Sequence, residues 1–453
     1  MAIWKGAIPY KDFFDHKPPL IFLLMALAWP LKHWGIFILG ALAKWIAACF
    51  IYRTARHMEV PYPWAFPIMF LILLLTPSIL MEGVLTREYA ACFLALLYAH
   101  LFSKRRDAFF TAGLLAALVF YTQQEELLPA IPLLVWYWLQ APPLTGKTLW
   151  QSRWEQAVQL VSGFLMFSLP IFIWFTLQNA LYAFWHESIS FNLFIYGSDA
   201  SLENKVSSLL FVLFHTRYLF LLLPLLGLHF WFAILNQRRS LHLAFVGSLI
   251  IFFIIKTTLG RIVDKQAFYH YMLPLSATVS FSLIVLTQEF RSLIRFFKPW
   301  VVIGILSVTF IVFWKNSASR LVALFKQRKP HPAELLKTEL IHLKNQDRQL
   351  YVMGLTKYIY LYNELNILSP SPWTYVSQYS QRLPFDPNAE VIDDIINSLE
   401  KYQTQWIVDY LLIRPLPQQL HQQKWESYLL KNFDEVKRTE NYILFKRKPH
   451  AIP

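Results

Sequence analysis

AVQLVSGFLMFSLPIFIWFTLQ, residues 157–178, runs for 22 residues without an Asp, Glu, Lys or Arg. An α-helix rises about 1.5 Å per residue, so about 20 apolar residues cross the ~30 Å hydrocarbon core of a membrane. This run therefore predicts a transmembrane helix. Comparable apolar runs lie at about 35–52, 63–80, 88–102, 108–122, 127–139, 211–235, 241–255, 269–287 and 299–315. Together with 157–178 they predict ten spans.

The charged residues are distributed unevenly along the 453-residue chain. They make up 15% of it, against about 25% in a typical soluble protein. Residues 1–315 hold 38 of them, whereas residues 316–453 hold 32 in less than half the length. This pattern excludes a soluble enzyme, a disordered chain and a disulfide scaffold. It predicts an α-helical polytopic membrane protein followed by a water-soluble domain. Cys49 and Cys92 lie in apolar runs and are expected to be small core residues, not a disulfide.

The loops between the runs differ in charge. One set, at 53–62, 103–107, 140–155, 236–240 and 288–298, holds 12 Lys/Arg and 4 Asp/Glu. The other set, at 1–17, 81–88, 123–126, 181–207 and 256–268, holds 8 Lys/Arg and 10 Asp/Glu. Basic loops stay in the cytoplasm, so the first set is predicted inside and the second outside. The net charge of +14 then reflects loop orientation and requires no nucleic-acid partner.

The short run PPLIFLLMALAWPL (18–31) begins with two prolines and has a third near its end. Its length suits an interfacial helix better than a span, and the loop charges alternate correctly only if it does not cross. We therefore predict three parts: an extracytoplasmic loop with an interfacial helix (1–34), a transmembrane domain of about ten helices (35–315), and an extracytoplasmic α/β domain (316–453).

The tail changes to a pattern of short strands and helices. RQLYVMG (348–354) and QWIVDYLLI (405–413) predict buried strands, and EVKRTENYILFKRK (435–448) predicts a hairpin that turns near Glu440. Helices are predicted at 356–365, at 389–402 and at 418–433. We find no Gly-rich phosphate loop, nucleophile elbow or metal-ligand spacing in this tail.

Ionisable residues at a membrane are functional candidates, and all the dense groups of them fall in the predicted outside loops. They are Gly6–Leu20, Met81–Tyr89, Gln123–Glu126, Trp185–Glu187 and Lys256–Tyr271. Away from the ends of the spans only Lys44 and Arg217 are charged, and both are expected to pair or snorkel. Lys and Arg neutralise phosphate oxygens, and a carboxylate can take a proton from a hydroxyl. These groups at a membrane surface suggest a substrate with a phosphate head on a lipid tail.

Four motifs carry a resemblance to a known family. PYKDFFDHKPPL (9–20) closely resembles the extracytoplasmic signature of bacterial GT-C glycosyltransferases that use polyprenyl-phosphate sugars, relatives of protein O-mannosyltransferases and aminoarabinose transferases. TREYAACFLALLYAHLF (86–102) resembles the family's second acidic loop entering a helix. AGLLAALVFYTQQ (112–124) resembles its glycine-rich helix, and FYHYMLPLSA (268–277) resembles its late His-Tyr segment. The resemblance covers essentially the whole chain.

The resemblance implies roles for individual residues. Lys17 is similar to the lysine that contacts the donor's lipid phosphate, with Arg261, His270 and Tyr271 as helpers. Glu88 matches the acid that orients the acceptor, and Glu82 is the alternative. The remaining expectations are catalytic roles for Asp12 and Asp15 and supporting roles for Tyr10, His16 and Arg87.

One departure from the family pattern affects the prediction. The family places its principal catalytic aspartate after a first transmembrane helix, upstream of the stretch with which this chain begins. We therefore expect the chain to lack that helix, which leaves Asp12 and Asp15 as the acids of the first loop. No cofactor is predicted; Asp12, Asp15 and His16 are weak candidates for a divalent metal.

These patterns predict an inverting membrane glycosyltransferase, placed in the bacterial inner membrane, that moves a sugar from polyprenyl phosphate to an extracytoplasmic lipid, glycan or protein. Two alternatives stay open. A transporter or lipid flippase would show inverted repeats and a polar site near the middle of the membrane. A catalytically degenerate scaffold of the cell envelope would match the missing aspartate.

Overall fold

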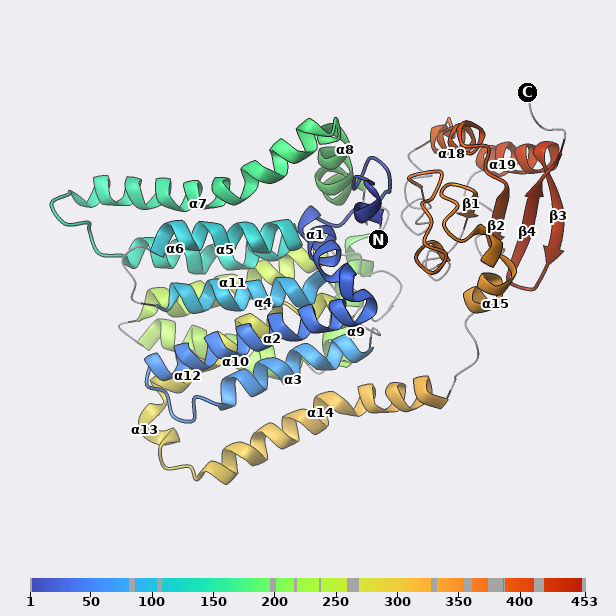
Figure 1. The fold of residues 1–453 in the computed structure, drawn as a ribbon. Helices are drawn as coiled ribbons and strands as arrows, with labels where there is room; N and C mark the ends of the chain where they lie inside the picture. The colour runs from blue at the N-terminus through green and yellow to red at the C-terminus, as the bar shows by residue number, and fades with distance from the viewer. Residues whose placement is uncertain are drawn as a thin grey trace. The chain divides into compact units, whose positions relative to one another are not determined.

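A computed structural model describes residues 2–80, 86–103, 108–195, 201–215, 218–235, 238–258, 269–326, 332–353, 361–373, 386, 388–410 and 419–449. The chain divides into two compact units (Figure 1). Unit 1 combines Met1–His16, Trp174–Tyr196 and Arg328–Pro453, and unit 2 combines Lys17–Ile173 and Gly197–Gln327.

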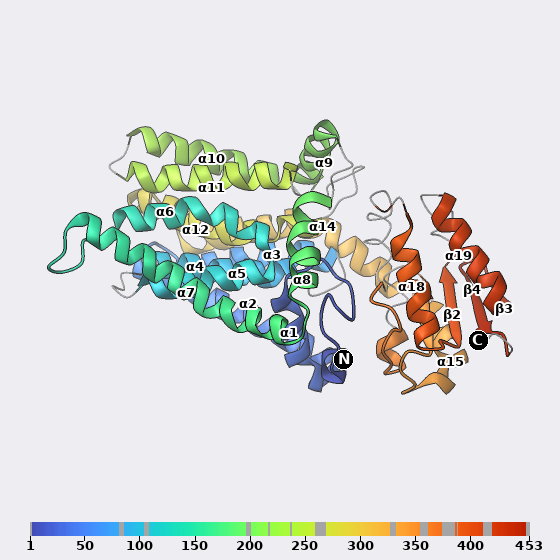
Figure 2. The same cartoon turned by 90° about the horizontal axis from the view of Figure 1, so that it is seen from above.

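Unit 2 is a bundle of α-helices. Its elements are α1 (Pro19–Ala28), η2 (Trp29–Leu31), α2 (Lys32–His57), α3 (Ala65–Leu80), α4 (Thr86–Leu101), α5 (Ala108–Thr122), η3 (Gln124–Ala130), α6 (Ile131–Gln140), most of α7 (Leu149–Leu177), α9 (Leu202–His215), α10 (Tyr218–Leu235), α11 (Arg239–Thr258), η5 (Tyr269–Met272), α12 (Leu275–Glu289), α13 (Arg291–Ile294) and α14 (Pro299–Lys326). Figure 2 shows α10 and α11 running side by side. Each predicted apolar run overlaps a helix, so the helical nature of these runs is confirmed.

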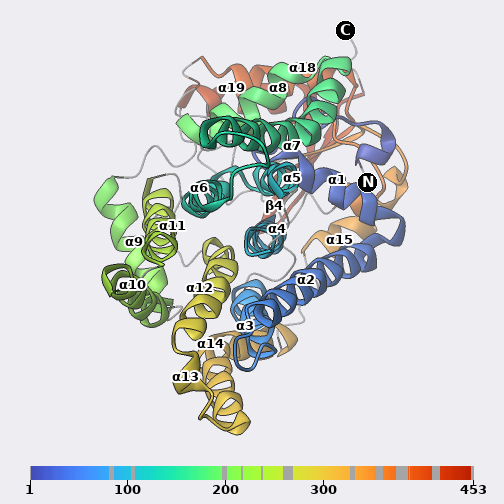
Figure 3. The same ribbon diagram turned by 90° about the vertical axis from the view of Figure 1, so that its left-hand side faces the viewer.

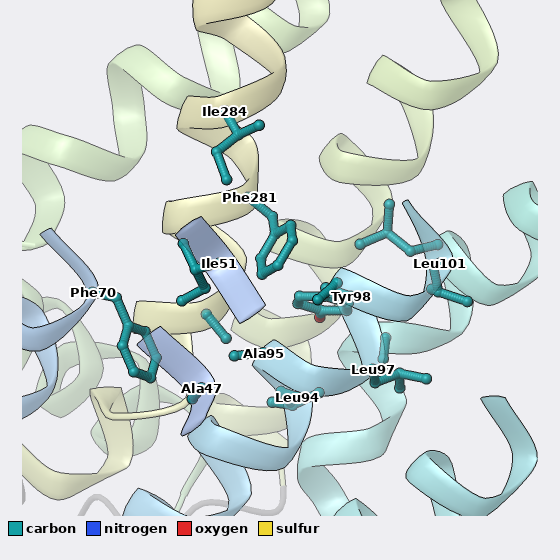
Figure 4. Close-up of a cluster of buried hydrophobic side chains, with 14 of the residues drawn as sticks. Ala47, Ile51, Phe70, Leu94, Ala95, Leu97, Tyr98, Leu101, Phe281 and Ile284 are labelled. Carbon is teal, nitrogen blue, oxygen red and sulfur yellow. The ribbon is translucent and has the colours of Figure 1, made fainter. Parts of the chain in front are cut away.

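The centre of the bundle is α4, which packs against α2, α5 and α12 (Figure 3). Nearly all of its side chains are buried because small residues alternate with large ones along it. Ala95 and Tyr98 on α4 meet Ile51 of α2 and Phe281 of α12 in the main apolar core (Figure 4). Cys92 belongs to the same core, and both cysteines are free thiols, as predicted.

The outer faces of several helices are also apolar. On α7, Leu165, Met166, Leu169 and Ile173 are all exposed. A continuous apolar surface of this kind is suited to lipid and not to water. Among the described residues, three helices are long and apolar enough to cross a membrane, namely Trp34–His57, Leu149–Leu177 and Arg239–Thr257. The other apolar helices are shorter, and the count of ten spans stays a prediction.

The predicted helix in 18–31 forms as α1, which packs against α2 and α5. It ends in the short turn η2, where Pro30 interrupts the regular α-helical bonding. Lys32 then takes a positive φ of 52°, so α2 starts in a new direction. The location of α1 at the membrane interface stays a prediction.

Helices α5 and α7 approach each other at two glycines. A Cβ built on Gly113 would lie 2.0 Å from the carbonyl oxygen of Leu160, and one on Gly163 would lie 1.9 Å from that of Phe110. Both contacts are with backbone atoms, which cannot rotate away. The two glycines therefore set the separation of these helices.

We expect Gly113→Ala to lower the free energy of unfolding by about 1–3 kcal/mol, because the added methyl group forces the helices apart. Gly227→Ala on α10 is the matched control, since no atom lies within 4 Å of a Cβ built there. Alanine is the better helix former by roughly 0.5–1 kcal/mol, so the control should be neutral or stabilising. Thermal unfolding in detergent measures both variants. Equal midpoints would contradict the close-packing account.

Unit 1 holds a small α/β fold. Its four strands are β1 (Leu350–Met353), β2 (Trp406–Tyr410), β3 (Phe433–Arg438) and β4 (Tyr442–Arg447), in the sheet order β1-β2-β4-β3. Strands β1 and β2 are parallel, and β4 is antiparallel to both β2 and β3. The described helices of this tail are α15 (Pro332–Glu339), η6 (Ile341–Leu343), α18 (Glu390–Lys401) and α19 (Gln419–Asn432). Unit 1 also holds η1 (Ala2–Lys5), α8 (Leu181–Phe184) and the π-helix η4 (Trp185–Ile195).

The predicted strands, the closing hairpin and the helices at 389–402 and 418–433 are confirmed. Half of the helix predicted at 356–365 falls outside the described residues, and residues 361–364 are helical. Trp425 of α19 packs against Tyr351 of β1 and Ile395 of α18 in the core of this domain. The amphipathic pattern of α18 explains the packing, since Val391, Ile392, Ile395 and Leu399 share one buried face.

Candidate functional site

Unit 2 contains a group of charged side chains that the helices bury together. We call it the buried charge cluster. It comprises Lys44 of α2, Arg87 and Glu88 of α4, Glu125 and Glu126 of η3, Lys256 of α11, and Tyr271 of η5. Ionisable groups are rarely buried unless they are paired or functional, so this cluster is the candidate site.

Local structure favours the charges at two of these positions. Arg87 and Glu88 lie in the first turn of α4, and the partial positive charge of a helix N-terminus stabilises the Glu88 carboxylate. Lys256 lies in the last turn of α11, where the partial negative charge of the C-terminus stabilises a cation. The carboxylates Glu125 and Glu126 follow directly after the apolar helix α5.

The cluster has two groups of contacts. In the first, Lys44 Nζ lies 2.7 Å from Glu88 Oε2, and only 2% of the Glu88 side chain is exposed. The cost of burying a lysine within an apolar helix is thus offset by an ion pair. Lys44 was expected either to pair or to snorkel, and in the structure it pairs with Glu88.

In the second group, Arg87 connects both carboxylates of η3. Its Nη2 lies 3.0 Å from Glu125 Oε1, and its Nε lies 3.5 Å from Glu126 Oε1. Lys256 Nζ also bonds to Glu126 Oε1. The Arg87 guanidinium lies over the Tyr271 ring at 3.9 Å, and Lys256 lies 5.6 Å from the same ring. Three cations and three carboxylates therefore balance within the cluster.

The two adjacent carboxylates of η3 differ in proton affinity. Burial raises the pKa of Glu126, and the neighbouring Glu125 adds to this, against the opposing pull of Lys256. Burial acts on Glu125 too, but Arg87 and Lys256 outweigh it and hold the pKa of Glu125 below its usual value. If one of the two carboxyl groups holds a proton, it is Glu126. Neighbouring carboxyl groups with separated pKa values suit acid–base chemistry.

We expect Lys44→Met to lower the free energy of unfolding by about 3–5 kcal/mol, because it leaves the Glu88 carboxylate buried without its counter-charge. Glu88→Leu should have a similar effect through the buried ammonium. The double variant should recover most of the loss, since apolar pairs commonly replace buried ion pairs at little cost. Thermal unfolding of the four proteins measures this cycle. Additive losses in the double variant would show that the two side chains do not interact.

The residues predicted in the first loop lie in unit 1. Asp12 Oδ2 accepts the backbone N–H of Ile8 at 2.7 Å and so closes the turn between these two residues. Within this turn Tyr10 has a positive φ of 69°. Burial raises the pKa of the Tyr10 hydroxyl, partly opposed by a hydrogen bond with Ser188. Asp15 Oδ1 lies 3.5 Å from His16 Nδ1.

The predicted residues of unit 2 are in part brought together. Arg87 and Tyr271 are in contact, although 184 positions separate them in the sequence. Lys17 is half-buried at the entry to α1. Glu82, Arg261 and the side chain of His270 lie outside the described residues.

Asp12, Asp15 and His16 do not form a metal-binding group. Within the described ranges, no three His, Cys, Asp or Glu side chains are placed to hold a metal ion.

The sequence assigned no catalytic or binding role to four members of the cluster, namely Lys44, Glu125, Glu126 and Lys256, although the segments that hold the last three were candidates. Lys256 directly follows the apolar run 241–255. Lys44 is a charge within an apolar run, and Glu125 and Glu126 follow one without an intervening turn. A charged residue at such a position is expected to have a partner, but the sequence does not identify it.

The fold was compared with known proteins. It is similar to the crystal structure of ArnT from Cupriavidus metallidurans bound to undecaprenyl phosphate, with a TM-score of 0.56 and 13% sequence identity. The alignment covers 97% of this chain and 90% of that one. The chain has a GT-C fold. No protein-family model matches the sequence, and no curated protein matches it either.

This similarity includes both the helical bundle and the tail, because it extends over nearly the whole chain. At 13% identity it shows the fold and not the activity.

Proposed function

We propose that this protein is a membrane glycosyltransferase that moves one sugar from a polyprenyl-phosphate donor to an extracytoplasmic acceptor. The observation that carries the proposal is the similarity over 97% of the chain to ArnT bound to undecaprenyl phosphate. The buried charge cluster supports it, because two of the four motifs that resemble GT-C enzymes, TRE at 86–88 and YHY at 269–271, meet there through Arg87 and Tyr271.

In the proposed reaction, an acceptor hydroxyl attacks the anomeric carbon of the sugar from the face opposite the phosphate. The new carbon–oxygen bond forms as the bond to the phosphate oxygen breaks, so the anomeric configuration inverts. Polyprenyl phosphate leaves as an anion, and the acceptor's proton passes to a carboxylate. Asp12, Asp15 and Glu88 are the proposed catalytic carboxylates. Asp12 already accepts the Ile8 N–H, and Glu88 pairs with Lys44.

Charge stabilisation at the leaving phosphate is assigned to Lys17, with Arg261, His270 and Tyr271 as helpers. A lysine beside the lipid phosphate gains importance as negative charge develops there. Arg87, stacked on Tyr271, holds that ring and its segment in place. In this scheme Lys44 is the counter-charge beside Glu88, and Glu88 accepts a hydrogen bond from the acceptor hydroxyl.

The proposed location is the bacterial inner membrane, with the tail domain outside the cytoplasm. The charge difference between the two sets of loops supports this orientation. The acceptor would then be a lipid, glycan or protein on the outer side of that membrane.

Binding of the carrier lipid tests the donor half of the proposal. Native mass spectrometry of the purified protein with undecaprenyl phosphate and with undecaprenol compares lipids that differ only in the phosphate. We expect a complex with the phosphate lipid that survives at lower lipid concentration than the alcohol complex. Equal retention of both lipids would mean that the protein does not recognise the phosphate, and would overturn the donor assignment.

A further inference from the structure

A pocket with several charged residues in its lining lies entirely within unit 1. It has a volume of about 390 Å³ and is formed by the first loop together with the tail domain. Lys11 and Asp12 line it from the loop, and Arg348, Lys401 and Tyr402 line it from the tail. Small-molecule sites typically measure about 300–1,000 Å³, so the volume suits a ligand of that class.

Contacts between the first loop and the tail domain hold the walls of this pocket together on both sides. On one side, Lys5 Nζ bonds to Asp347 Oδ1 at 2.7 Å and to the carbonyl oxygen of Asn366. On the other side, the Phe14 N–H donates to the carbonyl of Pro372 at 2.8 Å, and the Phe14 ring packs on Trp373. The first loop is therefore held against the tail domain and forms a fixed part of the pocket wall.

Positive charge dominates the lining. Lys11, Arg348 and Lys401 are cations, and Asp12 is the acid among the lining residues. Within the part of the chain that the structure describes, none of the three cations forms an ion pair with a carboxylate. Lys11 donates to the carbonyl of Gln178 at 2.8 Å, and Arg348 lies 4.0 Å from the centre of the Tyr402 ring. Lys401 lies 5.3 Å from the same ring.

One oxygen of the Asp12 carboxylate already accepts a hydrogen bond from the Ile8 N–H within its own turn. The pocket thus presents a net charge of about +2, which comes from three cations and one acid. Exposed cations without counter-charges are common, but three that line the same pocket favour an anionic ligand.

We propose that this pocket binds a small polar ligand through a phosphate or carboxylate group. Arg348 would hold the anion as a planar donor, and Lys11 and Lys401 would neutralise it from either side. The hydroxyl groups of Ser369 and Ser398, which also line the pocket, suit the sugar or glycerol part of such a ligand. The proposal does not require sugar transfer, although Asp12, one of the proposed catalytic carboxylates, also lines this pocket.

Protection of Arg348 from phenylglyoxal, measured on its peptide by mass spectrometry, tests the proposal on the full-length protein. The soluble probes are glucose 6-phosphate, glucuronate and, as the uncharged control, glucose. The lipid probe is phosphatidic acid in phosphatidylcholine nanodiscs, compared with nanodiscs of phosphatidylcholine alone. Protection by a soluble anion identifies a free ligand, and protection by phosphatidic acid alone identifies a lipid headgroup. Either result supports the proposal.

The variant Lys401→Gln removes one exposed cation at the end of α18 and leaves the fold intact. We expect it to raise the concentration needed for half-protection by about tenfold, as the loss of a charge-assisted contact typically does. Lys446→Gln is the matched control, because Lys446 also lies over an aromatic ring, that of Trp406, but does not line the pocket. No protection by any anionic probe, or equal protection in Lys401→Gln and wild type, would overturn the proposal.

Discussion

Replacing Lys17 with alanine is expected to lower sugar transfer about 10²–10³-fold, the usual effect of losing one preorganised charge contact to a developing anion. Membrane insertion and thermal stability should be unchanged. Donor binding should weaken less than turnover falls, because the charge on the phosphate grows in the transition state. Initial rates of transfer from polyprenyl-phosphate sugar in membranes measure the effect.

Two further variants make this experiment specific. Lys17→Arg should retain partial activity, since the charge remains but a planar guanidinium replaces a compact ammonium. Lys32→Ala removes another lysine, exposed at the start of α2, and should leave transfer unchanged. Unchanged turnover in Lys17→Ala would end the phosphate-contact assignment and leave Lys17 as an anchor near the headgroups.

The second large effect is expected at Arg87. Arg87→Gln leaves Glu125 and Glu126 buried with Lys256 as their sole cation among the described contacts of the cluster. We expect the free energy of unfolding to fall by about 3–5 kcal/mol. Glu125→Gln should restore part of this loss in the double variant, because it removes the carboxylate that Arg87 holds below its usual pKa. Thermal unfolding in detergent measures both.

The chain offers a matched control for this prediction. Arg291 and Glu59 form an ion pair with the same 3.0 Å separation as Arg87 and Glu125, but 71% of the Glu59 side chain is exposed. Surface pairs contribute about 0–1 kcal/mol, so Arg291→Gln should hardly change the midpoint. Equal losses for Arg87→Gln and Arg291→Gln would show that the cluster is solvated and not buried.

Much of the fold could be predicted from the sequence, because its determinants are local. Apolar runs must form helices in lipid to satisfy their backbone groups, and each predicted run overlaps one. The ends of the helices were harder to predict from the sequence. The run at 157–178 belongs to a helix that starts at Leu149, because residues 149–156 are helical without being apolar. Arg153 secures this extension by hydrogen bonds to the carbonyls of Trp138 and Leu139.

The candidate site was only partly predictable, because its contacts are tertiary. Glu88 was selected from its motif, but its partner Lys44 lies 44 positions earlier, on a different helix. Glu125 and Glu126 lay in a candidate loop, but only the structure shows that Arg87 and Lys256 pair with them. No single-sequence pattern specifies which of several charged loops meet. Nor did the sequence indicate that residues 1–16 and 174–196 group with the tail in one unit.

The double variant Lys44→Met/Glu88→Leu separates structure from chemistry at this site. It should fold nearly as well as wild type, because the buried pair is replaced by apolar side chains of similar size. If Glu88 orients the acceptor, transfer should nevertheless stay low. A purely structural role for the pair predicts that transfer recovers along with stability.

The central claim is that a sugar leaves polyprenyl phosphate and enters an extracytoplasmic acceptor. Its most direct test is to reconstitute the protein with a panel of radiolabelled polyprenyl-phosphate sugars and with lipid, glycan and protein acceptors from the outer side of the membrane. We predict that, for one donor, label enters an acceptor while an equal amount of free polyprenyl phosphate appears, and that Lys17→Ala abolishes most of both. Intact donor throughout the panel, with correctly folded wild-type protein and each acceptor class present, would contradict the account.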